Sequence, residues 1–227
     1  FLFLHHTTVP TEEEQFKTYK RMLEMMAPHP VTIRTLDLGG DKILPENTGV
    51  KMASAGLRAV RFCLKNKDIF KSQLRAMFRA AAFGDLRILV PFISCLSEVL
   101  SLKRIMKNVR QEMLSEGLEL NTEIPLGVMI EVPAAAIISD WIANETDFFS
   151  IGTNDLIQYT LAVSRDDASL DYLYHPLHPA MLRLMELTCH SAAKAGIPVT
   201  VCGEMAGDPR YTLVLIALGI TELSMNP

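Results

Sequence analysis

Two carboxylates at the ends of apolar runs are the side chains of this 227-residue sequence best suited to do chemistry. Residues 148–152 are mostly apolar and lead through a threonine to Asn154 and Asp155, and residues 126–130 run straight into Glu131. Short apolar runs are typical of buried parallel strands. The carboxyl ends of such strands form the active-site edge of α/β barrels. Two carboxylates and an amide at this edge indicate a site for a hard divalent cation and an anionic ligand.

Each carboxylate also has a structural interpretation when it is considered alone. A carboxylate at the end of a strand can cap the following helix or pair with an arginine. For Asp155, which lies in a Thr-Asn-Asp turn, capping is a serious alternative. The matching positions of Glu131 and Asp155 after two separate strands favour the metal-binding interpretation.

The elements that must position these residues alternate between strands and helices along the chain. Strands are predicted at residues 31–34, 87–92, 126–130, 148–152, 198–202 and 222–225. Helices are predicted at residues 11–26, 67–82, 97–116, 134–144, 179–194 and 209–218. The strand bodies are apolar without alternation, as expected for parallel strands covered on both faces. The predicted fold class is therefore α/β.

A barrel is favoured over an open sheet because polar residues follow four different strands. Arg34, Glu131, the pair of Asn154 and Asp155, and Cys202 each come at a strand end, and one ring of strand ends could bring them together. An open doubly wound sheet would use fewer strand ends, around one switch point. The sequence has no glycine-rich nucleotide-binding loop. We therefore predict an α/β barrel rather than an open sheet, with its site at the carboxyl ends of the strands.

The composition is that of a soluble globular protein: 49% of the residues are hydrophobic and the net charge is −4. This charge, with no cluster of basic residues, argues against nucleic acid or an anionic membrane as a partner. No apolar run is long enough for membrane insertion. The four cysteines lack the Cys-x-x-Cys spacing of zinc sites and disulfide frameworks, so a cytoplasmic location is expected.

Four segments in a fixed order resemble the phosphoenolpyruvate (PEP)-utilising enzyme family. They are TLDLGGDK at 35–42, MIEVPAAA at 129–136, SIGTND at 150–155 and VCGE at 201–204. Within the family they resemble the C-terminal PEP-binding domain of the phosphoenolpyruvate-protein phosphotransferases, Enzyme I of the bacterial sugar phosphotransferase system. The segments DLGGDK and QYTLAV, the latter at 158–163, favour this group over pyruvate phosphate dikinase and PEP synthase.

The resemblance implies a reaction and its partners. The expected reaction is phosphoryl transfer from PEP to a histidine on a separate domain and onward to the phosphocarrier protein HPr, with release of pyruvate. The expected cofactor is Mg²⁺, with Glu131 and Asp155 as its ligands. Two carboxylates suit this ion because it keeps bound waters and takes further ligands from the substrate.

The resemblance also assigns side chains that hold the substrate. Arg34, Arg58 and Arg165 match arginines that bind its phosphate and carboxylate, groups that guanidinium forks recognise with two parallel hydrogen bonds. Arg58 follows a segment, 52–56, that departs from the family pattern. Asn154 would donate its amide to the phosphate, and Asp155 would contact the substrate as well as the metal.

Cys202 matches the cysteine that protonates the enolate left after phosphoryl transfer. The structural alternative for a free cysteine is a small buried hydrophobe, and we accept it for Cys63, Cys95 and Cys189. Glu204 could contact the site residues without contacting the substrate itself, and the sequence leaves this open.

The ends of the chain suggest a fragment of a larger enzyme. In the family a strand ending in a phosphate-binding arginine precedes the segment that matches Phe1, and a closing helix follows the one that matches Pro227. The resemblance therefore implies that residues 1–227 are a PEP-binding (β/α)8 barrel of the TIM type that is truncated at both ends. Six of its eight strands would be in this chain, and the N-terminal phosphohistidine and carrier-binding domains would be absent. The parent enzyme is expected to be a homodimer through this domain. The isolated fragment is expected to be inactive in the overall reaction, so that it does not form pyruvate from PEP on its own.

Three other functions remain open. A fragment of pyruvate phosphate dikinase or PEP synthase would have the same site. A metal-dependent aldolase or lyase acting on pyruvate would share the barrel and both carboxylates, but would not need Cys202 or Arg165. A non-catalytic fragment that only binds a ligand is the third alternative.

Overall fold

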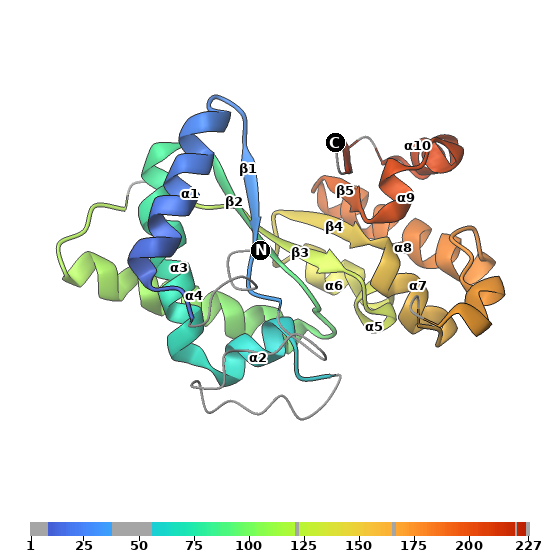
Figure 1. The fold of residues 1–227 in the computed structure, drawn as a ribbon, viewed down its shortest axis with the longest axis horizontal. Coiled ribbons are helices and arrows are strands. Elements are labelled where there is room, and N and C mark those ends of the chain that lie inside the picture. Colours follow the sequence, from blue (N-terminus) through green and yellow to red (C-terminus); the bar gives the residue numbers. More distant parts are fainter. Residues whose placement is uncertain (1–8, 38–55, 121–122, 165–166, 221, 226–227) are drawn as a thin grey trace. The chain divides into compact units, whose positions relative to one another are not determined.

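The computed structural model describes residues 9–37, 56–120, 123–164, 167–220 and 222–225 (Figure 1). The chain divides into two compact units. The first unit consists of Phe1–Pro91 with Leu100–Pro125, and the second consists of Phe92–Val99 with Leu126–Pro227.

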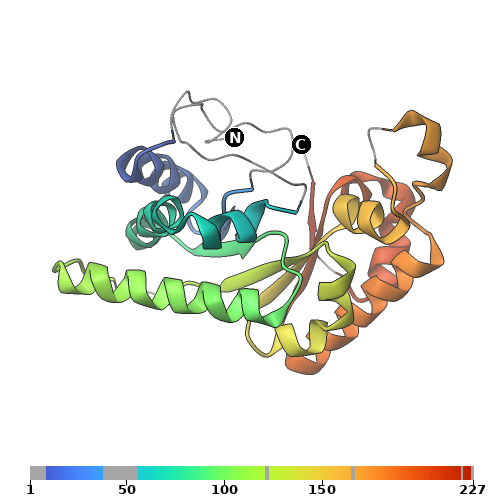
Figure 2. The ribbon, with the colours of Figure 1, turned by 90° about the horizontal axis from the view of Figure 1, so that it is seen from below.

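The first unit contains a pair of parallel strands and the helices around them. Its elements are α1 (Glu12–Met26), β1 (Val31–Arg34), α2 (Ala59–Lys65), α3 (Lys67–Ala80), the 3-10 turn η2 (Ala81–Phe83) and β2 (Leu86–Val90). In the β1–β2 ladder Val31 lies opposite Leu86. The long helix α4 (Leu96–Ser115) begins in the second unit and continues in the first (Figure 2, green).

Helix α1 begins at the capping box that the sequence predicts. The Thr11 hydroxyl accepts a hydrogen bond from the Glu14 N–H at 3.3 Å, and the Glu14 carboxylate accepts one from the Thr11 N–H at 2.8 Å. Helix α1 packs along α3 (Figure 1). Charge pairs join the two helices, because Arg75 and Arg79 of α3 both contact the Glu12 carboxylate, at 2.7 and 2.8 Å.

The second unit contains four parallel strands in chain order. Its strands are β3 (Leu126–Ile130), β4 (Phe148–Gly152), β5 (Val199–Cys202) and β6 (Glu222–Ser224). Its helices are α5 (Pro133–Ile137), α6 (Ser139–Ala143), α7 (Thr153–Leu161), α8 (Pro179–Ala195), α9 (Glu204–Gly207) and α10 (Thr212–Ala217), with 3-10 turns η3 (Ala168–Leu173) and η4 (Pro209–Tyr211).

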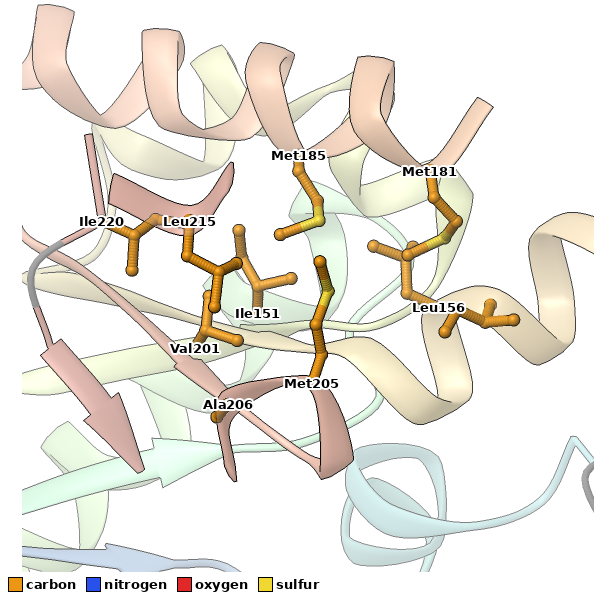
Figure 3. Close-up of a cluster of buried hydrophobic side chains, with 10 residues drawn as sticks. Ile151, Leu156, Met181, Met185, Val201, Met205, Ala206, Leu215 and Ile220 are labelled. Carbon is orange, nitrogen blue, oxygen red and sulfur yellow. The ribbon is translucent and has the colours of Figure 1, made fainter. Parts of the chain in front are cut away.

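The helix-covered face of β4 and β5 holds the core of the second unit. Ile151 and Val201 lie in a fully buried cluster with Met181 and Met185 of α8 and Leu215 of α10 (Figure 3). Successive strand residues point to opposite faces. The residues between these apolar ones therefore point away from this core.

The predicted α/β class is confirmed. The described residues form six strands that are parallel to their neighbours within each unit and are joined by helices, as in an incomplete barrel of the TIM type. Within the described residues, no helix combines the length and apolar character needed to cross a lipid bilayer.

Two predicted elements differ in the structure. The strand predicted at 87–92 ends at Val90, because Pro91 follows it and Phe92 has a left-handed backbone with φ of 63°. The helix predicted at 134–144 is two short helices, since Ile138 between them has φ of −105° and ψ of 23°. Helices α2 and α9 were not predicted; both have fewer than eight residues, too short for a clear periodic pattern.

Candidate active site

The polar side chains of β4 and β5 share the face that lies opposite the helix-covered core. In the ladder Ser150 lies opposite Thr200, and Gly152 lies opposite Cys202. Because partners in a parallel ladder point to the same side, these four residues line one face of the sheet. That face presents hydroxyl and thiol groups toward the carboxyl ends of the two strands.

Glu131 follows β3 and its side chain lies against the end of β4. The residue is only 4% exposed, and its Oε1 accepts a hydrogen bond from the Phe92 N–H at 2.7 Å. A Cβ added to Gly152 would lie 2.9 Å from both Cβ and Oε2 of Glu131. The absence of a side chain at Gly152 therefore makes the room that this carboxylate occupies.

Asn154 joins the turn after β4 to the turn after β5. Its Oδ1 accepts a hydrogen bond from the Glu204 N–H at 3.1 Å, and its Nδ2 lies 3.5 Å from Glu204 Oε1. The Thr153 hydroxyl donates to the Cys202 carbonyl at 3.0 Å. Gly203 has φ of 99°, and a Cβ there would lie 2.6 Å from the Thr153 hydroxyl oxygen. Glu204, whose role the sequence leaves open, therefore contacts Asn154 through both its backbone and its side chain.

Asp155 is the third residue of α7. A carboxylate in the first turn interacts favourably with the helix N-terminus. Both predicted roles of Asp155, as a metal ligand and as a helix-capping group, remain predictions.

Cys202 is half-buried and its sulfur is held by two hydrogen bonds. The Ser150 hydroxyl donates to Sγ at 3.5 Å, and the thiol donates to the Ile151 carbonyl at 3.5 Å.

Burial raises the pKa of the Cys63 thiol to about 12 and that of Cys189 to about 11. These two thiols therefore stay protonated at neutral pH, in agreement with the structural role expected for them.

In the first unit, Arg34 and Arg58 converge on Asp37. Arg58 makes a two-pronged pair with the Asp37 carboxylate, with Nε to Oδ1 at 3.1 Å and Nη2 to Oδ2 at 2.9 Å. Arg34 Nη2 lies 3.7 Å from the same Oδ2. The Asp37 side chain is 6% exposed, whereas that of Arg34 is 49% exposed. One buried carboxylate thus gathers two guanidinium groups, and the less buried of them can also contact an anion.

A buried chain of hydrogen bonds supports the segment that carries Asp37. The Leu36 N–H donates to Gln73 Oε1 at 2.9 Å, and Gln73 Nε2 lies 3.2 Å from the Tyr19 hydroxyl. That hydroxyl lies 3.3 Å from Gln15 Oε1. Burial raises the pKa of Tyr19 to about 12, so the hydroxyl stays protonated and available as a donor.

The sequence-predicted residues fall into two groups. Glu131, Asn154, Asp155 and Cys202 belong to the second unit, and Arg34 and Arg58 belong to the first. Arg165 and residues 38–42 of the TLDLGGDK segment lie outside the described residues. The sequence interpretation missed Asp37, although its place three residues after Arg34 in a quoted segment was a usable signal.

The carboxylate oxygens of Glu131 and Asp155 are of the chemical type that binds Mg²⁺. Glu131 and Asp155 supply hard carboxylate oxygens after neighbouring strands, and Mg²⁺ is commonly held by one or two protein carboxylates together with water and substrate oxygens. Among the described residues no group of three or more histidine, cysteine, aspartate or glutamate side chains could hold a metal. Any Mg²⁺ held by this pair would therefore depend on water or substrate for its remaining ligands.

Parallel strands with a carboxylate, an amide and a thiol at their carboxyl ends define an α/β protein of the barrel type, with its candidate site at the strand ends. The family model described as "PEP-utilising enzyme, PEP-binding domain" matches residues 1–227. The chain belongs to this family, as the sequence resemblance predicted.

The most similar relatives carry one name. Proteins called "Phosphoenolpyruvate-protein phosphotransferase" from Priestia megaterium and Geobacillus stearothermophilus are each 46% identical to the chain over 228 residues. The one from Bacillus subtilis is 44% identical. These alignments cover 100% of the chain but only 39–40% of each relative, so the chain spans about 40% of their length.

Solved structures with a similar fold are distant in sequence. A malate synthase from Haloferax volcanii, in a magnesium and glyoxylate complex, has a TM-score of 0.60 at 14% identity, covering 92% of this chain and 55% of its own. A citrate lyase from Burkholderia xenovorans has a TM-score of 0.53 at 16% identity, covering 69% and 50%. At these identities the similarity shows the fold alone.

Proposed function

We propose that this chain is the PEP-binding catalytic domain of a phosphoenolpyruvate-protein phosphotransferase. The whole enzyme would transfer a phosphoryl group from PEP to a histidine on a separate domain and on to HPr, releasing pyruvate. The observation that carries this proposal is that hydrogen bonds join the turns after β4 and β5. The Thr153 hydroxyl donates to the Cys202 carbonyl, and the Asn154 side chain is hydrogen-bonded to Glu204. The proton donor and the phosphate-binding amide of the family would then be held on adjacent strands.

Glu131 and Asp155 would hold Mg²⁺ in this enzyme. When bound, the ion would supply positive charge that offsets the negative charge developing on the substrate during phosphoryl transfer. Arg34, Arg58 and Arg165 would bind the phosphate and carboxylate groups. The pairing of Arg34 and Arg58 with one buried aspartate supports their assignment to a common anion site.

Cys202 would complete the reaction by protonating the substrate carbon. After the phosphoryl group leaves, the remaining enolate needs one proton on its methylene carbon to become pyruvate. The sulfur is held by partners on the neighbouring strand, so its position is defined before the substrate arrives.

The chain covers about 40% of its relatives, so the phosphohistidine and carrier-binding domains would belong to the remaining length. We infer that residues 1–227 are a barrel domain with six of eight strands, from a homodimeric cytoplasmic enzyme. A dikinase or synthase fragment has the same site and is the second candidate. The consistent name of the relatives favours the phosphotransferase. A metal-dependent aldolase or lyase would share the barrel and both carboxylates, but it would not need Cys202 or Arg165.

The test is an assay with purified chain, PEP, Mg²⁺ and HPr. The chain alone is expected to form no phosphorylated HPr, because the described and predicted site contains no phosphoacceptor histidine. Joining it to the histidine-bearing domain of a relative, together with that relative's residues on both sides of the matched segment, is expected to restore transfer. Phosphorylated HPr formed at an enzymatic rate by the chain alone would overturn this proposal, as would failure of the joined protein when that of the relative is active.

Replacing Asp37 with alanine tests the shared anchor of the two arginines. Removal of the carboxylate releases Arg34 and Arg58 from their shared anchor and takes away the two-pronged pair of the partly buried Arg58. PEP affinity, measured by calorimetry, is expected to fall about tenfold or more, because a charge-assisted pair is worth roughly 1.5–3 kcal/mol. Asp208→Ala removes another Arg–Asp pair, on an exposed turn, and is the control. Equal PEP affinity in both variants would contradict the role of Asp37.

A further inference from the structure

The hydroxyl of Ser150 is committed to the sulfur of Cys202. Ser150 is 3% exposed, and its hydroxyl oxygen lies 3.5 Å from Sγ. The Cys202 sulfur is the only hydrogen-bond partner of this hydroxyl among the described residues. The strand register explains the contact, because Ser150 lies one layer below Gly152, the residue opposite Cys202, on the same face.

A neutral thiol is a poor partner for a buried hydroxyl. Neutral sulfur is a weak hydrogen-bond acceptor, and a buried polar group without a good partner destabilises the fold. A thiolate is different, because hydrogen bonds to charged groups are roughly twice as strong as neutral ones. The arrangement therefore favours the charged form of the sulfur, which arises when the thiol gives up its proton.

The second contact of the sulfur is compatible with this role. The thiol proton points to the Ile151 carbonyl at 3.5 Å. Rotation about the Cβ–Sγ bond moves only this hydrogen, so the sulfur can turn its proton toward a substrate while it still accepts the Ser150 hydrogen bond. Cys202 is half-buried, so water can return the proton afterwards.

We propose that Ser150 stabilises the Cys202 thiolate that forms during enolate protonation, an inference that rests on the proposed function. In this step the S–H bond breaks, a C–H bond forms at the methylene carbon, and the electron pair of the broken bond remains on sulfur. The Ser150 O–H donates to that electron pair. The thiolate then takes a proton from water, and the thiol is restored for the next turnover.

Two measurements on the purified chain test this role. The first is the rate of Cys202 alkylation by iodoacetamide at one pH, followed by peptide mass spectrometry so that Cys95 is counted separately. The second is loss of the pyruvate methyl proton signal in D₂O with Mg²⁺, since a thiol that protonates the enolate must, as thiolate, deprotonate pyruvate. Pyruvate affinity is measured alongside, so that binding and proton transfer are separated.

Ser150→Ala is expected to slow Cys202 alkylation roughly four- to fifteenfold. The lost hydrogen bond lowers the thiolate population more than it raises the intrinsic nucleophilicity of the sulfur. Methyl exchange is expected to slow about tenfold at unchanged pyruvate affinity. Thr200→Val is the matched control, because Thr200 lies opposite Ser150 on the same face and its hydroxyl contacts the Phe149 carbonyl instead. Both rates of the control are expected to equal those of the parent chain.

Alkylation at the parent rate in Ser150→Ala would overturn the inference, whatever the exchange shows. The same applies if Thr200→Val slows alkylation as much, since the effect would then be a general loss of strand packing. Thermal unfolding of both variants checks that they are folded. If Cys202→Ala does not slow exchange, the proposed role of Cys202 is wrong. The alkylation result would then still decide whether Ser150 stabilises its thiolate.

Discussion

Replacing Glu131 with glutamine is expected to abolish Mg²⁺-dependent binding of PEP while the fold is retained. The amide keeps an oxygen that can accept the Phe92 N–H, now bonded at 2.7 Å, but loses the negative charge that a hard cation needs. Loss of one of two carboxylate ligands is expected to lower the Mg²⁺ affinity by about a hundredfold or more, since a bound metal ion of this kind contributes several kcal/mol of charge stabilisation. Calorimetric titration with PEP, with and without Mg²⁺, measures the effect.

Cys202→Ala is the control for this prediction, because the thiol acts after the substrate is bound. It should leave PEP binding nearly intact and impair only proton delivery, whereas Asp155→Ala should match the loss in Glu131→Gln. Glu131→Ala should in addition lower the free energy of unfolding by roughly 1–3 kcal/mol, because the buried hydrogen bond from the Phe92 N–H to the Glu131 carboxylate is lost. Equal loss of PEP binding in the Cys202 and Glu131 variants would remove the case for separate roles.

The strand ends were predictable because local patterns determine them. Apolar runs of about five residues identified β3 and β4, so the places of Glu131 and Asp155 followed directly from the sequence. The predicted end of β2 was wrong for two reasons. Pro91 lies within the apolar run, and nothing in the sequence indicates that the aromatic residue Phe92 has a left-handed backbone. That backbone turn is what brings the Phe92 N–H to the Glu131 carboxylate.

The supporting residues of the site were not predictable in the same way. The contact of Asp37 with Arg58 spans 21 residues and depends on tertiary packing. Ser150 appears in the sequence as one small residue within an apolar strand, and only the register with β5 shows that it contacts a sulfur. The same holds for Gly152 and Gly203, whose need for glycine comes from side chains that approach from another turn or strand.

Gly152→Ala adds only one methyl group but is expected to displace the Glu131 carboxylate of the candidate site. The backbone of Gly152, with φ of −87° and ψ of 89°, lies outside the left-handed region, so the effect comes from the new methyl group. That methyl would lie 2.9 Å from Cβ and Oε2 of Glu131, closer than carbon atoms can approach, and Cβ of Glu131 cannot move without its strand end. Overpacking of this kind costs about 1–3 kcal/mol, and a displaced carboxylate should weaken Mg²⁺ binding about tenfold or more.

Gly207→Ala is the matched control for this prediction. Gly207 lies in the same unit. Among the described residues, a methyl group there would meet only Cβ of Met225, at an ordinary contact distance of 3.6 Å. The control should keep both the melting temperature and the Mg²⁺ affinity of the parent chain, while Gly152→Ala lowers the melting temperature by roughly 2–4 °C per kcal/mol lost. If Gly152→Ala binds Mg²⁺ and PEP as tightly as the control, metal binding does not depend on the position of the Glu131 carboxylate beside Gly152. The assignment of Glu131 as a metal ligand would then be wrong.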